Sequence, residues 1–187
     1  GTLFSDDTSK QVTTGAYITN TGMSGTLKSF RIINCRVSRN IAGARMGTGT
    51  TLLFSVSGSI RSDDFEITNN RLQVAGLRAG SSIVGIVSIG LGVTASQSFA
   101  IHKNNIIMTG SATVTATTPL VFIASCLGTI VSAAPVFNIT QNSIIASQIN
   151  TDGLVPVIAS FSASAMFVTG EFLFQSNALL ITASIDN

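Results

Sequence analysis

The sequence predicts an all-β fold, a parallel β-helix (solenoid) of about five three-stranded coils stacked along one axis. Two observations carry this prediction: a repeat with a period of about 35 residues, and alternation of apolar and polar residues within each repeat. The repeat reads Phe, any residue, Ile, two residues, Asn, one residue, then an aliphatic residue. Its copies begin at Phe30, Phe65, Phe99, Phe137 and Phe172, with spacings of 35, 34, 38 and 35 residues.

Alternation with a period of two residues is typical of a strand that buries one face, because successive side chains point to opposite sides. A helical solenoid would need a period of about 3.6 residues and many helix-forming residues. The chain is instead rich in Ser, Thr, Gly, Val and Ile. We therefore expect the repeats to direct one set of residues inward: Phe30, Ile32, Phe65, Ile67, Leu72, Phe99, Ile101, Ile106, Phe137, Ile139, Ile144, Phe172, Phe174 and Leu179.

A third apolar run precedes each Phe and supplies the remaining strand of each coil. The runs are Thr51–Val56, Ile83–Ser88, Leu120–Ser125 and Val155–Ser160, with a weaker version at Ala16–Ile18. Because each coil holds three short strands, strand pairing has to occur between successive coils rather than within one coil.

The Asn of the repeat lies between two alternating runs, where the chain must turn. Asn suits such a position because it tolerates unusual backbone angles and hydrogen bonds nearby backbone. In a stack, equivalent side chains lie about 4.8 Å apart, so their amides can hydrogen bond from coil to coil. We predict a structural ladder of Asn70, Asn104, Asn142 and Asn177, with Cys35 at the equivalent position of the first copy.

Composition indicates a single β-helix domain, residues 1–187. Charged residues make up 10% and hydrophobic residues 45% of the chain, which suits a continuous core whose outer faces carry Ser and Thr. The longest apolar stretch, Ile83–Val93, is broken by glycines and is too short to span a bilayer, so no membrane insertion is expected. The chain starts at Gly1 rather than Met, and we expect it to be part of a longer protein or assembly.

Charge is distributed unevenly along the chain. All ten Lys and Arg residues lie in residues 1–103 with five acidic residues, whereas residues 104–187 carry three acidic residues alone. The last coil, from Phe172 to Ile185, is apolar and is followed by two residues, and at most fourteen residues precede the first strand. We expect such ends to be covered, either by further coils or by copies stacked head to tail into a filament.

The two cysteines, Cys35 and Cys126, lie about three coils apart, which is too far for a disulfide, so we expect two free thiols with at least one buried. Free thiols argue weakly against secretion. The triplet Asn138-Ile-Thr140 argues weakly for it, as a possible glycosylation site at Asn138.

The sequence offers little catalytic chemistry. His102 is the sole histidine and lies beside Lys103 at an outward position, which is more typical of a surface residue than of a base. Asp63, Asp64 and Glu66 form the densest acidic group, but neighbouring coils add no carboxylates, and an Arg31–Glu66 ion pair explains Glu66 more simply. We predict no catalytic residue, no metal site and no cofactor.

Arginines recur in the first half of the chain, and Arg36 and Arg71 share one repeat position. With Arg31 they form a possible basic patch for an anion or a glycan. Nucleic-acid binding would need aromatic residues interleaved on the same face, whereas the Phe residues are predicted to point inward. No phosphate-binding loop is present, so nucleotide binding is not expected either.

The Phe-x-Ile-x-x-Asn-x-aliphatic units, separated by Ser/Thr/Ala/Val strands, resemble the pectin-lyase-like right-handed parallel β-helices across residues 16–185. More narrowly, they resemble the repeats of the kinetoplastid dispersed gene family surface proteins. The resemblance implies a right-handed winding and a large surface or extracellular protein with adhesive or matrix-binding roles. It implies no active site, because the calcium-binding aspartates and the catalytic arginine of the lyases have no matching set here.

The expectation is therefore a structural or adhesive β-helix without catalysis, located outside the cell or on its surface. Its expected partners are further coils or copies, with glycans or matrix as possible ligands. The alternative is a carbohydrate-active enzyme, a polysaccharide lyase or hydrolase, on the same fold. Carboxylates that converge in a groove from adjacent coils would favour the enzyme, and a smooth Ser/Thr face would favour the structural role.

Overall fold

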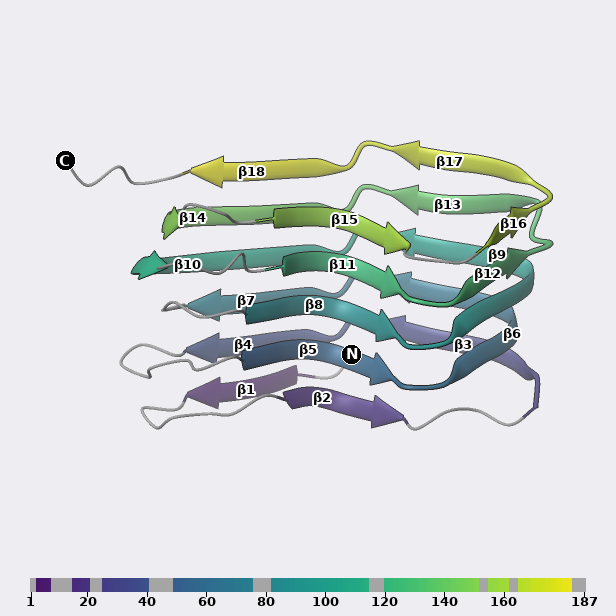
Figure 1. The fold of residues 1–187 in the computed structure, drawn as a ribbon, viewed down its shortest axis with the longest axis horizontal. Coiled ribbons are helices and arrows are strands. Elements are labelled where there is room, and N and C mark those ends of the chain that lie inside the picture. Colours follow the sequence, from purple (N-terminus) through teal and green to yellow (C-terminus); the bar gives the residue numbers. More distant parts are fainter. Residues whose placement is uncertain are drawn as a thin grey trace.

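Parallel strands stack along one axis and form three sheets, which we name A, B and C (Figure 1). The structure is a computed structural model, and it describes residues 3–7, 15–20, 25–40, 49–75, 82–114, 120–151, 155–161 and 165–182. In these ranges every regular element is a strand, so the predicted all-β class is confirmed.

Each sheet collects equivalent strands from successive coils. Sheet A has the order β1 (Leu3–Asp7), β4 (Arg36–Asn40), β7 (Arg71–Ala75), β10 (Asn105–Val114), β14 (Ser143–Thr151) and β18 (Ala178–Thr182). Sheet B has the order β2 (Gly15–Asn20), β5 (Gly49–Val56), β8 (Ser82–Ile89), β11 (Leu120–Cys126) and β15 (Val155–Phe161). Sheet C contains β3 (Leu27–Ile33), β6 (Ser59–Thr68), β9 (Gly92–His102), β12 (Thr129–Ser132), β13 (Val136–Thr140), β16 (Met166–Val168) and β17 (Glu171–Gln175).

The chain passes from sheet B to sheet C to sheet A in each coil and then starts the next coil above. In Figure 1 the strands of sheet B run from left to right in front, those of sheet A return behind, and the chain rises from purple to yellow. The winding is therefore right-handed. The strand pairs between coils are parallel throughout the described part of the chain, as a β-helix requires.

The register places the repeat in vertical columns. Phe30 pairs with Phe65, Phe65 with Phe99, Phe99 with Phe137 and Phe137 with Phe172. The ring centroids of successive pairs are 5.5, 4.9, 3.8 and 5.2 Å apart, and the rings stack. A column of stacked rings fixes the order and phase of the coils, because a slipped coil would lose its ring contact.

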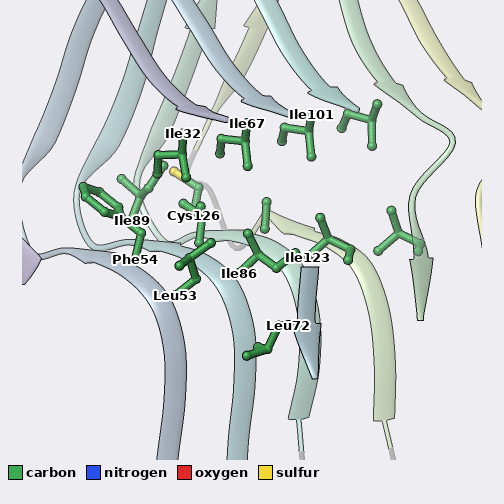
Figure 2. Close-up of a cluster of buried hydrophobic side chains, with 14 of the residues drawn as sticks. Ile32, Leu53, Phe54, Ile67, Leu72, Ile86, Ile89, Ile101, Ile123 and Cys126 are labelled. Atoms are coloured by element: carbon green, nitrogen blue, oxygen red, sulfur yellow. The ribbon is translucent and has the colours of Figure 1, made fainter. Parts of the chain in front are cut away.

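In each coil, the strand of sheet B bends toward the core at one position along its length. Two consecutive residues, Leu53 and Phe54, both join the core, although alternation would send one of them outward (Figure 2). The bend lies where the paired register skips a residue, between Leu52–Gly85 and Phe54–Val87. Because of this bend, Leu53 of sheet B packs in the same core as Ile67 of sheet C.

Most of the predicted inward residues are buried, but those of the last coil are not. Phe137 and Ile144 are fully buried, whereas Phe172, Phe174 and Leu179 are about half exposed, with 48%, 52% and 49% of their surface accessible. Their register is as predicted, and the exposure arises because no described coil lies above them.

The lower end of the stack differs from the expectation of an equally open edge. Phe30, Ile32 and Val37 of the first coil are buried, with 6%, 6% and 2% of their surface accessible. Strand β1 pairs with β4 and so extends sheet A one level further down. The expected capping role of residues 1–14 lies mostly outside the described residues.

Candidate functional site

The asparagine of each later repeat lies at the corner between sheets C and A. Asn70, Asn104 and Asn142 are buried in the stack, and Asn177 is half-buried. The side-chain nitrogen of Asn70 donates to Oδ1 of Asn104 at 2.9 Å, and Asn104 donates in the same way to Asn142 at 3.0 Å. Asn142 donates to Asn177 at 3.0 Å. The four side chains that were predicted to stack are thus joined by one chain of hydrogen bonds.

The ladder has a direction. The second amide hydrogen of Asn104 is donated downward, to the backbone oxygen of Ile67 at 2.7 Å. Its Oδ1 accepts from below, from both the side chain and the backbone N–H of Asn70, the latter at 3.1 Å. Each asparagine therefore presents an acceptor to the coil below and two donors to the coil above.

The unusual backbone angle of this corner lies one residue before the ladder asparagine, not at it. Every described coil has a positive φ at that residue: Asn34 at 58°, Asn69 at 55°, Lys103 at 56°, Gln141 at 57° and Ser176 at 56°. The side chains of these residues are exposed, while the asparagine turns inward. The corner thus separates two tasks that the sequence argument had assigned to one residue.

Both cysteines are buried and free, as predicted. Cys35 takes the ladder position of the first coil, where its backbone N–H donates to Oδ1 of Asn70 at 3.0 Å. Its thiol lies 3.7 Å from the backbone oxygen of Ile33, to which it can donate a weak hydrogen bond. Cys126 lies in sheet B, and burial raises the pKa of its thiol despite a hydrogen bond to the backbone oxygen of Gly128.

The acidic group lies on the outer face of sheet C and is engaged by neighbouring coils. Arg31 approaches Glu66 at 3.4 Å, as expected, and also Asp64 at 3.5 Å. From the coil above, Ser98 donates to Asp64 at 2.8 Å and Ser96 donates to Asp63 at 2.6 Å. These contacts join one carboxylate-bearing strand to both of its neighbours, and each of the three carboxylates has a partner from an adjacent coil.

The proposed basic patch is divided between two sheets. Arg36 and Arg71 are register partners in β4 and β7 of sheet A. Arg31 lies in β3 of sheet C, where Glu66 and Asp64 offset its charge. The structure brings the first two residues together and places the third on another face.

Two further predicted residues lie on the outer face of sheet C. His102 is half-buried, and its Nδ1 lies 2.9 Å from the hydroxyl of Thr140 in the coil above. Asn138 is half-buried within β13, and its side-chain oxygen is buried without a hydrogen-bond partner. It therefore lies in a strand of the stack and not in a surface loop.

Metal and ligand chemistry finds little support in the described part of the chain. No three His, Cys, Asp or Glu side chains there gather closely enough to hold a metal ion. A cavity of about 10 Å³ lies in the core beside Phe99 and Cys126, lined by other apolar side chains such as Val93. It has room for about one water molecule at most and few polar groups to hold it. The described elements include no helix that is long and apolar enough to cross a membrane.

The fold and its internal ladders define the chain as a right-handed parallel β-solenoid. Comparison with protein-family models, with curated proteins and with solved structures finds no match to this chain.

Proposed function

We propose that this β-solenoid is a structural or adhesive part of a surface or extracellular protein, and that it catalyses no reaction. The observation that carries the proposal is that the polar residues form hydrogen bonds and ion pairs between adjacent coils. The Asn ladder joins each coil to the next, and the acidic group is held by Arg31, Ser96 and Ser98 from adjacent coils. Polar groups that bind neighbouring coils make a stiff rod, which suits a spacer or a display scaffold.

The adhesive surface in this proposal is the outer face of sheet C. This face carries hydroxyl, carboxylate, amide and imidazole groups, including Ser98, Glu66, Asn138 and His102, with apolar residues such as Ala100 between some of them. Such groups can hydrogen bond the hydroxyls of a glycan or the polar groups of a matrix polymer. The extracellular location is supported by the resemblance to adhesive β-helices, whereas the position of Asn138 inside β13 weakens the argument from the Asn138-Ile-Thr140 triplet.

The family proposal is narrower than the fold. We propose that the chain is related to the pectin-lyase-like β-helices, and among them to the kinetoplastid dispersed gene family surface proteins. The support is the recurrent Phe-x-Ile-x-x-Asn-x-aliphatic unit, which forms the same corner in each coil.

A carbohydrate-active enzyme is the second candidate, because Asp63, Asp64 and Glu66 lie together on the face that would contact a glycan. The contacts of Arg31 with Asp64 and Glu66 weigh against it, since a catalytic pair needs carboxylates that face a substrate.

A glycan array combined with turnover assays on uronic-acid polymers tests the proposal. We expect retention of one class of glycan and no release of unsaturated or reducing-end products. His102→Ala and Glu66→Gln, on sheet C, should weaken retention, whereas Arg71→Ala on sheet A is the matched control. Product release that disappears in Glu66→Gln would replace the structural role with the enzymatic one.

A further inference from the structure

The upper end of the solenoid exposes an apolar face made by β17, β18 and the corner between them. Phe172, Phe174, Leu179 and Ile181 are 45–52% exposed there. Their register partners one coil below, among them Phe137 and Ile144, are fully buried. The same residue positions are therefore core in one coil and surface in the next, so this face has the shape of an interior layer.

The corner residues Ser176 and Asn177 add a specific hydrogen-bonding pattern to this face. In the coils below, the N–H before the ladder asparagine donates upward to a backbone oxygen, as Gln141 does to Gln175 at 3.2 Å. The backbone N–H of Asn142 donates upward to an asparagine Oδ1 at 3.0 Å, and its carbonyl oxygen accepts from Ala178 at 2.9 Å. Each bond repeats from coil to coil.

At the top of the stack these groups have no partner among the described residues. They are the N–H groups of Ser176 and Asn177, the second side-chain amide hydrogen of Asn177 and its carbonyl oxygen. The Oδ1 of Asn177 is already occupied from below by Asn142. An occupant must therefore offer one backbone oxygen, one backbone N–H and a side-chain oxygen that accepts two hydrogen bonds. An asparagine followed by a strand supplies this set.

We propose that this face binds a strand–turn–strand segment of a partner polypeptide that carries the pattern Phe-x-Ile-x-x-Asn-x-aliphatic, added parallel to β17 and β18. The partner's Phe stacks on Phe172, and its Asn accepts the two free donors of Asn177. This is strand addition at a sheet edge, in which main-chain hydrogen bonds supply affinity and the side-chain pattern supplies specificity. The inference deepens the proposed structural role and depends on neither a glycan nor a location.

A second copy stacked head to tail fits this face poorly. The first and last described strands, β1 and β18, both belong to sheet A. If β1 of one copy paired with β18 of another, its β2 would lie two levels above β15, and one level of sheets B and C would stay empty. The lowest described ladder position of that copy is Cys35, which follows β2 and β3 and would therefore lie two levels above Asn177, out of reach of its donors.

A second copy that meets this one top to top fits no better. Both Asn177 side chains would then present donors without a free side-chain acceptor, because each Oδ1 already accepts from Asn142. The polarity of the ladder thus favours a partner that approaches with its own acceptor side.

The test uses a labelled peptide with the sequence of residues 136–147, which holds Phe137, Asn142 and Ile144 in the required pattern, flanked by lysines for solubility. Its binding to the full chain is measured by fluorescence polarisation. We expect saturable binding, weakened about tenfold or more when the peptide carries Asn142→Ala.

Protein variants locate the binding. Phe174→Lys and Asn177→Ala should each weaken binding, while Leu91→Lys is the control, because Leu91 is an exposed apolar residue between β8 and β9, two coils below this face. Circular dichroism checks that each variant is folded. No saturable binding, or binding equally strong with the Asn142→Ala peptide, would overturn the proposal. Self-association of the chain that Phe174→Lys abolishes would also overturn it, in favour of a second copy.

Discussion

At the scale of single residues, the ladder asparagine links three coils with one side chain. Asn104 accepts from Asn70 below, donates to Asn142 above and donates to the backbone oxygen of Ile67. Asn104 is fully buried, so if its side chain were removed, its hydrogen-bond partners would be left unpaired and could not bond to water instead.

We therefore expect Asn104→Ala to lower the free energy of unfolding by about 1–3 kcal/mol, because it leaves the backbone N–H of Asn70 and the oxygen of Ile67 buried and unpaired. Denaturant titration measures the change. Gln73→Ala removes a similar amide from the outer face of sheet A and should change stability by no more than about 0.5 kcal/mol. Equal effects of the two substitutions would contradict the ladder's contribution.

The sequence predicted the positions at which one residue type recurs in each coil. It did not predict the positions at which a backbone conformation recurs with different residue types. The Phe and Asn columns were predictable because one residue type returns at each level. The positive φ before each ladder asparagine was missed, since Lys103, Gln141 and Ser176 share no side-chain chemistry. The division of the arginine patch follows from the corner at Cys35, which the repeat predicted and which puts Arg31 in β3 and Arg36 in β4.

At the scale of the element, the corner from sheet B to sheet C depends on close backbone approach. A Cβ added to Gly128 would lie 1.1 Å from the backbone oxygen of Leu91 in the coil below. Two successive coils therefore contact each other through backbone atoms here, and a Cβ at Gly128 requires the backbone of one coil to shift.

Gly128→Ala should therefore destabilise the fold by about 3 kcal/mol or more, since the coils must move apart to admit the methyl group. Thermal unfolding followed by circular dichroism measures it. The neighbouring exposed residue provides the control, because Leu127→Ala removes side chain without adding contact and should have little effect. If the Gly128→Ala protein unfolded at the same temperature as the unchanged protein, the corner would have to open without cost.

Sheet C contains strands that the sequence predicted and strands that it did not. In the lower coils it is formed by single long strands, β6 and β9, but in the fourth coil β12 and β13 are separated by residues that include Pro135. Proline has no N–H to donate to the coil above. The fifth coil is divided at the same place, between β16 and β17, although its intervening residues are Thr169 and Gly170. The Phe-containing strand was predicted, whereas the short strand before it lacks a repeated residue type and was not.

At the scale of the whole molecule, the two ends of the stack differ in protection. Strand β4 has neighbours on both sides, β1 and β7, while the described strands give β18 one neighbour, β14. Coils that contact one neighbour open more readily than coils that contact two, because stability in a solenoid comes largely from nearest-neighbour contacts.

Amide hydrogen exchange should therefore be faster in β17 and β18 than in β9 and β10, with β4 nearer to the protected group. Mass spectrometry of peptic fragments reads this gradient directly. Equal protection of β18 and β10 in dilute solution would mean that another element covers the upper face.

The register of the ladder also limits how the length of such a chain can change. Arg71 and Asn105 are register partners, and each follows a ladder asparagine. Removing residues 71–104 would join Asn70 to Asn105, leave β5 to meet β11, and place Phe65 beneath Phe137. Losing a single residue inside a strand would instead shift its register by one, so that side chains that point inward would point outward. Gene changes that add or remove a whole coil are thus the ones that this architecture can absorb.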